Sequence, residues 1–293
     1  MKDLVLITTY QRPEYLWYCL DSLVKAEGRN GKDVAIFHDH HPHDTGGTRE
    51  SLEVFKDFVD RDALSLVWID QARNSWHGNS FNTLEAYRWA FAQHEYRYVY
   101  LIEDDLLVAN DFFKWHETVQ ASGNYFCTVG RPCPHNRSYV PSDDPSLYCV
   151  SSRDYASLGV CWKRENLDAV VAHANAAYYG NMVWYCRTHF PSSNMGSEFT
   201  EQDGLIERVV KADASRLTAF PCRSRVFHIG VTGYHRPNGP RFHGAWRQRA
   251  DQLGQAMLTG MLARMRKDFV ELNDIDQPRP TPEWSELKVS QRF

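Results

Sequence analysis

Short apolar runs alternate with amphipathic segments over the first hundred residues. The runs have the length and composition of strands and lie at residues 4–9, 34–37, 64–69 and 98–102. Helical spacing of apolar residues follows Pro13 and recurs at residues 52–59 and 83–93, whereas the polar stretch 74–80 predicts a loop. Repeated strand–helix units predict an α/β fold. Its largely parallel central sheet would have helices on both faces and bind ligands beyond the carboxyl ends of the strands.

The rhythm changes after the fourth predicted strand. Glu103, Asp104 and Asp105 end that strand, and Asp111 is placed to cap the next helix. Further along we expect short strands at residues 126–129, 147–150, 158–162 and 226–229, and helices at residues 165–177, 201–211 and 245–269. The proline-rich tail from residue 276 is expected to be an extended strap or disordered.

The composition is that of a globular protein. The chain has 293 residues, 43% apolar and 24% charged, which excludes a disordered or fibrous protein. No run reaches the ~18 apolar residues of a membrane span, and residues 1–10 lack the regions of a signal peptide, so we expect a cytoplasmic protein. The seven cysteines form no CxxC pair, which argues against a disulfide framework or zinc knuckle and predicts reduced core thiols.

The charge is distributed unevenly. The net charge is −4, yet residues 214–250 contain no Asp or Glu. The arginines and histidines of this segment are Arg216, Arg223, Arg225, His228, His235, Arg236, Arg241, His243, Arg247 and Arg249. We expect a local positive potential that binds an anionic group. The alternative is a basic surface that pairs with acidic patches elsewhere.

The carboxylates at residues 103–105 are the clearest chemical signal. Adjacent like charges at the end of an apolar strand repel and raise one another's pKa. A divalent cation offsets that repulsion, and hard oxygen ligands favour Mg²⁺ or Mn²⁺, with open coordination positions left for substrate phosphates. The alternative is an acidic loop that caps the next helix, but Asp111 is better placed for that role.

Residues 98–113, YVYLIEDDLLVANDFF, resemble the metal-binding DxD region of GT-A glycosyltransferases. They are particularly similar to the N-acetylglucosaminyltransferase I group, in which EDD is followed by an apolar stretch and DFF. Residues 87–90, YRWA, look like that group's preceding helix. Residues 7–16, ITTYQRPEYL, look like the first strand and helix of family 2 glycosyltransferases. The resemblance covers residues 1–115 and implies a GT-A type, Rossmann-like fold with a smaller acceptor-side β region and a C-terminal helix.

The resemblance implies roles at the nucleotide. Asp105 would bind a Mn²⁺ or Mg²⁺ ion that bridges the donor diphosphate, and Asp104 or Glu103 would face the ribose. The residues that would line the nucleotide are Thr8, Thr9, Tyr10 and Arg12. Asp39, after the second strand, would bind the base or the ribose. Residues 38–44, HDHHPHD, also suit a separate transition-metal site, which ranks lower because the chain offers no second ligand cluster.

The later half of the chain matches more loosely. Residues 157–160, SLGV, resemble a glycine loop in which Gly159 lets the backbone approach the donor and the acceptor. Residues 200–205, TEQDGL, resemble the xED segment, in which a carboxylate at the start of a helix acts as the base of inverting enzymes. Asp203 fits that role. Gln202 stands where the motif has Glu, so Glu201 stays an alternative, as does an ordinary acidic helix N-terminus.

Residues 220–235, FPCRSRVFHIGVTGYH, resemble the segment that supplies a late metal-binding histidine. His228 is the first choice and His235 its competitor, and either could instead be a hydrogen-bonded core residue. The flanking arginines that suit a diphosphate are Arg223, Arg225 and Arg236, because guanidinium groups match phosphate oxygens.

The resemblance as a whole implies a metal-dependent glycosyltransferase. It would move a sugar from a nucleotide sugar, with a UDP-sugar favoured, to an acceptor hydroxyl. Asp203 on the acceptor side implies inversion, and its absence from there would allow retention. Residues 1–115 would be the nucleotide-sugar-binding Rossmann-like half, 116–244 the acceptor-binding and catalytic half, and 245–293 the C-terminal helix and tail.

The acceptor stays open at this point. Candidates are a glycan or its lipid-linked precursor, a protein, or a hydroxylated base in DNA, in a bacterial or viral host cytosol. The arginines and aromatic residues of segment 214–250 would suit DNA. A sugar nucleotidyltransferase would need a glycine-rich phosphate loop where residues 9–13 read TYQRP. A non-catalytic sugar- or nucleic-acid-binding module would not need the carboxylate–metal set.

Overall fold

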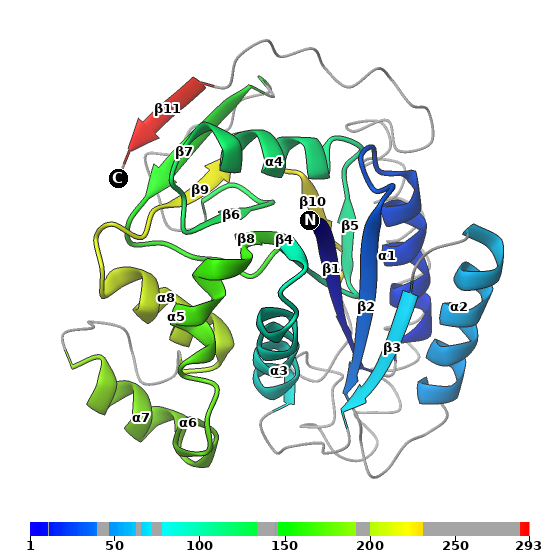
Figure 1. Ribbon diagram of the computed structural model, residues 1–293, viewed down its shortest axis with the longest axis horizontal. Coiled ribbons are helices and arrows are strands. Elements are labelled where there is room, and N and C mark those ends of the chain that lie inside the picture. The colour runs from blue at the N-terminus through cyan, green and yellow to red at the C-terminus, as the bar shows by residue number, and fades with distance from the viewer. Residues whose placement is uncertain are drawn as a thin grey trace, which may run out of the picture.

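The protein is built on one large sheet with helices on both faces (Figure 1). The computed structural model describes residues 1–10, 12–39, 47–62, 66–71, 78–133, 144, 146–191, 200–230 and 288–292. Within these residues the large sheet has nine strands in the order β11-β7-β9-β6-β8-β4-β1-β2-β3. They are β1 (Lys2–Thr9), β2 (Lys32–Asp39), β3 (Leu66–Gln71), β4 (Tyr96–Glu103), β6 (Cys127–Val129), β7 (Leu147–Ser151), β8 (Val160–Lys163), β9 (Thr218–Pro221) and β11 (Lys288–Arg292).

The strand directions confirm the expected α/β class. β3, β2, β1 and β4 pair in parallel, and so do β6 with β9 and β7 with β11. β8 runs antiparallel between β4 and β6, and β7 runs antiparallel to β9. A second, two-stranded sheet joins β5 (Leu106–Val108) to β10 (Val226–His228) in antiparallel register. Most of the pairings in the central sheet are therefore parallel.

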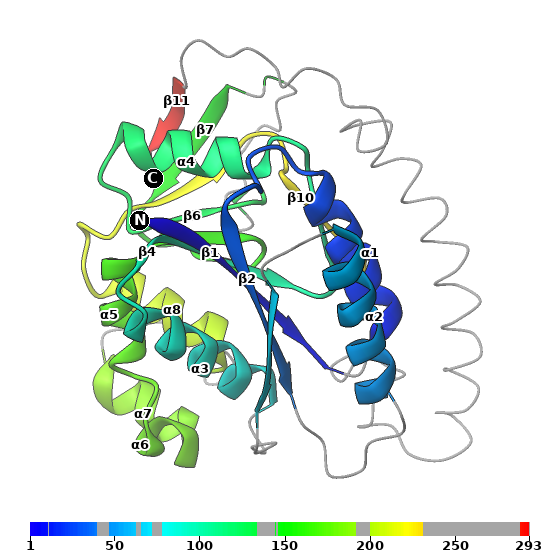
Figure 2. The ribbon, with the colours of Figure 1, turned by 45° about the vertical axis from the view of Figure 1, so that its right-hand side comes forward.

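Alternate residues of each central strand feed two separate cores. Leu4 and Leu6 of β1 pack with α3 (Gly78–Ala92), α5 (Asp168–Val171) and α8 (Gln202–Lys211). Val5 and Ile7 pack with α1 (Pro13–Lys25), α2 (Gly47–Asp62) and α4 (Phe112–Ser122) on the opposite face. The turned view separates α1 and α2 from α3, α5 and α8 across the sheet (Figure 2). Strands buried on both faces are almost wholly apolar, which explains the continuous apolar runs in the sequence.

The first helix follows its local signals. Pro13 occupies the first turn of α1, where its missing N–H is not needed, and Leu16 and Leu20 are fully buried on the face toward the sheet. The helix ends at Lys25, and Gly28 and Gly31 then adopt φ values of 79° and 81°. These left-handed conformations return the chain to β2 at little steric cost.

Several boundaries differ from the sequence expectation. α3 begins at Gly78, so residues 78–80, expected in a loop, form its first turn. The helix expected over 165–177 is a 3₁₀ turn (Arg164–Leu167) and α5, and a new helix, α6 (Ala176–Gly180), begins because the Asn175 side chain accepts hydrogen bonds from the N–H groups of Ala177 and Tyr178. β9 and α7 (Met182–His189) were not predicted. Both are short elements stabilised by tertiary contacts.

Asp111 does not play the expected capping role. It precedes α4 at the N-cap position, but its side chain makes no capping hydrogen bond. Its Oδ2 instead accepts a hydrogen bond from Nε of Arg225 at 3.2 Å. Arg225 is 1% exposed, so burial of the guanidinium requires this partner. The Asp111 carboxylate therefore pairs with the buried Arg225, which directly precedes β10, and does not cap α4.

Two expectations fall partly or wholly beyond the described residues. The helix expected at 245–269 lies outside them, and of the tail only β11 is described, as an extended strand paired with β7. Among the described residues no helix has both the length and the apolar character to cross a bilayer. All seven cysteines are buried, and none of them forms a disulfide bond.

Gly159→Ala should destabilise the fold. Gly159 has a φ of 65°, and an added Cβ would lie 2.5 Å from Val226 Cγ1 and 3.0 Å from Phe112 Cε2. We expect the free energy of unfolding in urea to fall by about 1–3 kcal/mol. Gly180→Ala is the control, because its Cβ would meet nothing within 4 Å. Equal stability of the two variants would contradict this packing.

Candidate active site

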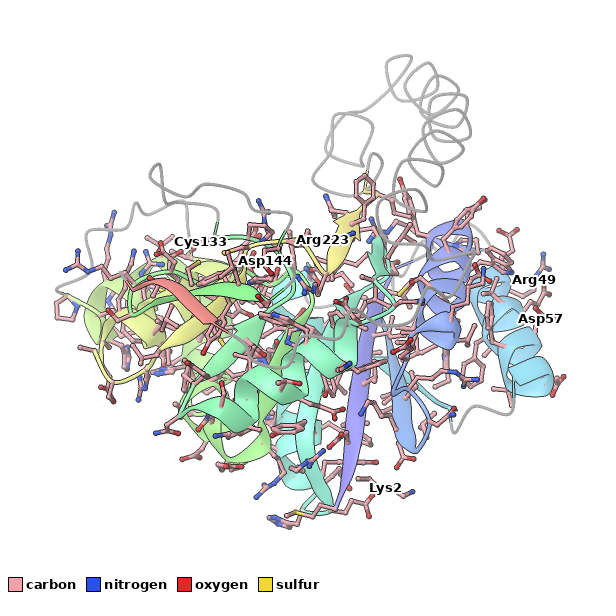
Figure 3. All side chains as sticks on the ribbon, turned by 90° about the horizontal axis from the view of Figure 1, so that it is seen from above. Lys2, Arg49, Asp57, Cys133, Asp144 and Arg223 are labelled. Atoms are coloured by element: carbon pink, nitrogen blue, oxygen red, sulfur yellow. The ribbon has the colours of Figure 1, made fainter. Side chains whose placement is uncertain are left out.

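The site forms where β1 and β4 end side by side. Thr8 of β1 is the register partner of Glu103, and the N–H of Asp104 donates to the carbonyl of Thr8 at 3.0 Å. On the other side of β1, Thr9 is the register partner of His38 in β2. Parallel strands end at the same edge of a sheet, so this register brings residues 8–12 to the acidic residues 103–105. β1 runs from Lys2 toward the side of the molecule on which Arg223 lies (Figure 3).

Asp104 is fully buried and surrounded by donors. Its Oδ2 accepts hydrogen bonds from Thr9 Oγ1 at 2.8 Å, from the N–H of Tyr10 at 3.4 Å and from Nε of Arg12 at 3.2 Å. Its Oδ1 forms an ion pair with a terminal nitrogen of Arg12. Burial raises the pKa of Asp104 to about 6, against the opposing effect of Arg12. The first strand and its loop therefore hold this carboxylate in place.

Asp105 lies between Arg12 and His228. Its Oδ2 accepts from an Arg12 terminal nitrogen at 2.9 Å and lies 3.4 Å from Nε2 of His228. The pairing of β5 with β10 brings His228 here, and the N–H of Ile229 donates to the carbonyl of Asp105 at 2.9 Å. Burial would raise the pKa of Asp105, but Arg12 and His228 outweigh it and hold this pKa below its ordinary value. The two first-choice metal ligands from the sequence thus lie together.

Glu103 points to a different neighbour. Its Oε1 accepts a hydrogen bond from Nδ2 of Asn79 in the first turn of α3 at 2.9 Å. Burial, followed by the charges of Asp105 and Asp203, raises the pKa of Glu103 to about 8. Asp203 is far from Glu103 in sequence, yet its charge is one of the causes of this shift.

Asp203 is an exposed carboxylate at the edge of the site. It lies in the first turn of α8, and its side chain reaches solvent. The protein around its other sides raises its pKa to about 6 by desolvation, while a hydrogen bond with the buried Ser157 acts in the opposite direction. Glu201, the alternative base, is the N-cap residue of α8, is exposed and makes no capping hydrogen bond. An accessible carboxylate with a raised pKa suits a general base.

The first turns of α3 and α8 are joined by a buried pair. Ser80 Oγ donates to Gln202 Oε1 at 2.8 Å and accepts from the backbone N–H of Gln202 at 3.1 Å. Ser80 is 1% and Gln202 5% exposed. Gln202, which departs from the xED pattern, is thus a neutral partner for Ser80. Because Asn79 binds Glu103, two adjacent residues of α3 connect Glu103 to the helix that carries Asp203.

The residues around Asp105 fit a divalent cation. Asp105 Oδ1 is buried and has no hydrogen-bond partner within the described part of the chain. A Cβ on Gly230 would lie 2.4 Å from Asp105 Oδ2 and 2.7 Å from His228 Nε2, so glycine leaves room beside both atoms. A carboxylate and an imidazole suit Mn²⁺, with further positions open to phosphate oxygens. The described residues contain no group of three or more His, Cys, Asp and Glu that could complete a metal site alone.

Two other sequence candidates have structural contacts. Arg225 donates to Asp111 and, from a terminal nitrogen, to the carbonyl of Arg223 at 2.6 Å, and its guanidinium lies 5.8 Å from the ring centre of Trp115. Gly159 is buried, and its carbonyl accepts from the N–H of Gly130 at 2.7 Å. Donor binding by either residue stays a prediction.

The remaining candidate residues lie either at the carboxyl edge of the central sheet or outside the described residues. Asp39, the last residue of β2, is buried and follows His38, the partner of Thr9. His235 and Arg236 lie outside the described residues, as do residues 40–44 of the alternative metal site. Sequence reasoning missed Asn79 and Ser80, because a helix that starts at Gly78 has no strong local signal.

Comparison with known proteins finds similarity only among solved structures. No protein-family model matches the chain, and no curated protein matches it. TarS 1-349 of S. aureus has 14% sequence identity, with 72% of this chain and 55% of that chain covered and a TM-score of 0.45.

Two further structures are similar at the same level. The mannosyltransferase PcManGT from Pyrobaculum calidifontis, in complex with GDP-Man and Mn²⁺, has 15% identity, 57% and 46% coverage and a TM-score of 0.43. The glycosyltransferase GlyE of Streptococcus pneumoniae TIGR4 has 9% identity, 72% and 44% coverage and a TM-score of 0.43. The chain spans about half the length of these structures. At this level of similarity the structures do not assign a function to this chain.

Ser80→Ala should destabilise the protein, because it leaves the buried amide oxygen and N–H of Gln202 without their partner. We expect a loss of about 1–3 kcal/mol in urea unfolding, and Ser80→Thr should retain most of the stability. The control is Ser215→Ala, whose exposed hydroxyl donates to Asp213 at 2.6 Å and should change stability by less than about 0.5 kcal/mol. Similar losses for Ser80→Ala and Ser215→Ala would refute the buried pair.

Proposed function

We propose that this protein is a metal-dependent, GT-A type glycosyltransferase that uses a nucleotide sugar. The observation that carries the proposal is the approach of His228 to Asp105, 3.4 Å between Nε2 and Oδ2, at the carboxyl edge of a parallel sheet. Asp105 lies just after β4 of the large sheet, whereas His228 is the last residue of β10 in the two-stranded sheet. Both side chains nevertheless face the same space beside Gly230. Ligand sites of α/β sheets lie at this edge.

The donor side is supported by charge and geometry. Arg12 and His228 present nitrogen atoms at Asp105, where the diphosphate of a nucleotide sugar would need positive charge. Thr8, Thr9 and Tyr10 lie at the end of β1 and would line the nucleotide, with Asp39 of the neighbouring strand near the base or ribose. We favour a UDP-sugar as the donor. A divalent cation bound at Asp105 and His228 would offset the charge that develops on the leaving diphosphate.

The base is proposed to be Asp203. The acceptor oxygen would form a bond to the anomeric carbon, the bond from that carbon to the diphosphate oxygen would break, and its electron pair would leave with the diphosphate. Asp203 would accept the proton of the acceptor hydroxyl. Ser157 would hold the Asp203 carboxylate, and Ser80 would hold the start of its helix through Gln202. A single displacement of this kind inverts the anomeric configuration.

The acceptor is proposed only as a hydroxyl group. A glycan fits the exposed position of Asp203, and hydroxylated bases in DNA stay the second candidate because of the arginine-rich segment 214–250. Most of that segment lies outside the described residues. A sugar nucleotidyltransferase is less well supported, because the loop after β1 presents the Arg12 side chain to the carboxylates rather than a glycine-rich backbone.

Loss of Asp105 should abolish metal-dependent nucleotide binding. We expect Mn²⁺ with UDP or GDP to raise the thermal midpoint of the wild type, because a ligand at 100 times its Kd adds about 2.7 kcal/mol of stability. Asp105→Asn keeps the shape of the side chain but loses its charge, and should show no such shift. Asp60→Asn, at an exposed position of α2, should behave as the wild type. Equal shifts in Asp105→Asn and the wild type would contradict the donor site.

The pH dependence should follow the Asp203 carboxyl group. A base must be deprotonated to accept a proton, so activity should decline as pH falls through about 6 and level off above it. Asp203→Asn should lower kcat by about 10²- to 10⁴-fold while nucleotide binding persists. Release of nucleoside diphosphate from the nucleotide sugar that gives the largest thermal shift measures both effects. A comparable loss in Glu201→Gln, with Asp203→Asn active, would move the base to Glu201.

A further inference from the structure

Arg12 bridges two adjacent carboxylates of the site. Nε donates to Asp104 at 3.2 Å, one terminal nitrogen donates to Asp105 at 2.9 Å, and the other pairs with Asp104. The guanidinium carbon lies 5.1 Å from the centre of the Tyr15 ring, and the side chain is 23% exposed. Burial would lower the pKa of Arg12, but Asp104 and Asp105 outweigh it and raise this pKa, so the guanidinium is a permanent charge.

The same carboxylate oxygen serves Arg12 and the candidate metal site. Oδ2 of Asp105 accepts from Arg12 and also faces His228 at 3.4 Å. A divalent cation held between Asp105 and His228 would therefore lie next to the guanidinium, and like charges at such a distance repel in a partly buried site. Arg12 must leave Asp105, or the cation must bind weakly.

We propose that Arg12 is a resident counterion that keeps free divalent cations from binding Asp105 and His228 tightly, and that it moves to the diphosphate when the donor binds. The inference rests on the proposed function, because it takes a nucleoside diphosphate as the ligand. Before binding, the guanidinium offsets part of the negative charge of Asp104 and Asp105. The diphosphate then supplies negative charge for both the guanidinium and the metal.

The consequence is coupling between the two ligands. A planar guanidinium matches two phosphate oxygens, so its loss from Asp105 is compensated when the diphosphate arrives. Metal and nucleotide should then each increase the affinity of the other by the same factor, as linkage requires. Asp104, which is fully buried and also held by Thr9 and Tyr10, would keep its hydrogen bonds to those residues when Arg12 moves.

Mn²⁺ binding to the full chain, followed by electron paramagnetic resonance of the free ion, tests the counterion. With Mn²⁺ alone, Arg12→Met should bind at least about 10-fold more tightly than the wild type, and Arg12→Lys, which keeps the charge, should resemble the wild type. The matched control is Arg49→Met on α2. The Arg49 side chain is 76% exposed, and the residue is labelled in Figure 3. Equal affinities for Mn²⁺ in Arg12→Met and the wild type would overturn the inference.

UDP and GDP form the second arm of the experiment. Saturating UDP or GDP should increase the Mn²⁺ affinity of the wild type by about 10-fold, beyond the binding of Mn²⁺ by the free nucleotide, and should do so much less in Arg12→Met. An equal increase in both proteins would overturn the coupling. If neither nucleotide binds with or without Mn²⁺, the proposed function fails. The comparison of Mn²⁺ affinity between Arg12→Met and the wild type still tests the counterion role of Arg12 in that case.

A measurement on the wild type guards against a misfolded Arg12→Met. The Nε–H resonance of Arg12 can be followed by NMR with diamagnetic Mg²⁺ in place of Mn²⁺. We expect a small change with Mg²⁺ alone and a large one with Mg²⁺ and UDP together, because only then does the guanidinium exchange a carboxylate for phosphate. An unchanged resonance in the presence of bound nucleotide would refute the movement of Arg12.

Discussion

Burial of Asp104 and Asp105, beside the half-buried Glu103 that ends β4, is the constraint on which the rest of the site depends. No single residue contacts all three carboxyl groups among the described residues. Asn79 donates to Glu103, Arg12 pairs with Asp104 and Asp105, and His228 faces Asp105. Ionised carboxylates in a protein interior require opposite charge or hydrogen bonds, and an uncompensated buried charge destabilises a fold by several kcal/mol, on the order of 3–5. Together the three residues bring the loop after β1, the first turn of α3 and the end of β10 to this edge of the sheet.

The partners define two sides of the site. Arg12 from the loop after β1 and His228 from β10 face Asp105, on the side where a diphosphate would lie. Asn79 from α3 binds Glu103, and the adjacent Ser80 ties α3 to the helix of the candidate base. Residues that stabilise the buried charges are thus the same residues that would position the reactants. Stability and the proposed chemistry share one network of hydrogen bonds.

Sequence pattern predicted the elements whose signals are local. β1 to β4 are short apolar runs, and α1 starts at Pro13. The three consecutive acidic residues that begin at the end of β4 are also visible in the sequence. Phosphate binding by Arg225 stays a prediction, but its buried pairing with Asp111, whose side chain was expected to cap α4, was not foreseen. No local pattern reveals such a pair, because its two halves come from distant segments. The bridging role of Arg12 and the start of α3 at Gly78 were missed for the same reason.

Crystals grown with MnCl₂ and UDP and measured at the manganese absorption edge would show whether Asp105 and His228 hold the metal. We expect one strong anomalous peak at coordination distance from Asp105 and His228, with the UDP diphosphate on the same ion and Arg12 turned toward the phosphates. A peak elsewhere, or bound UDP with no manganese at Asp105 and Arg12 still paired to it, would rule out this arrangement. The described geometry leaves the space beside Gly230 as the place to look.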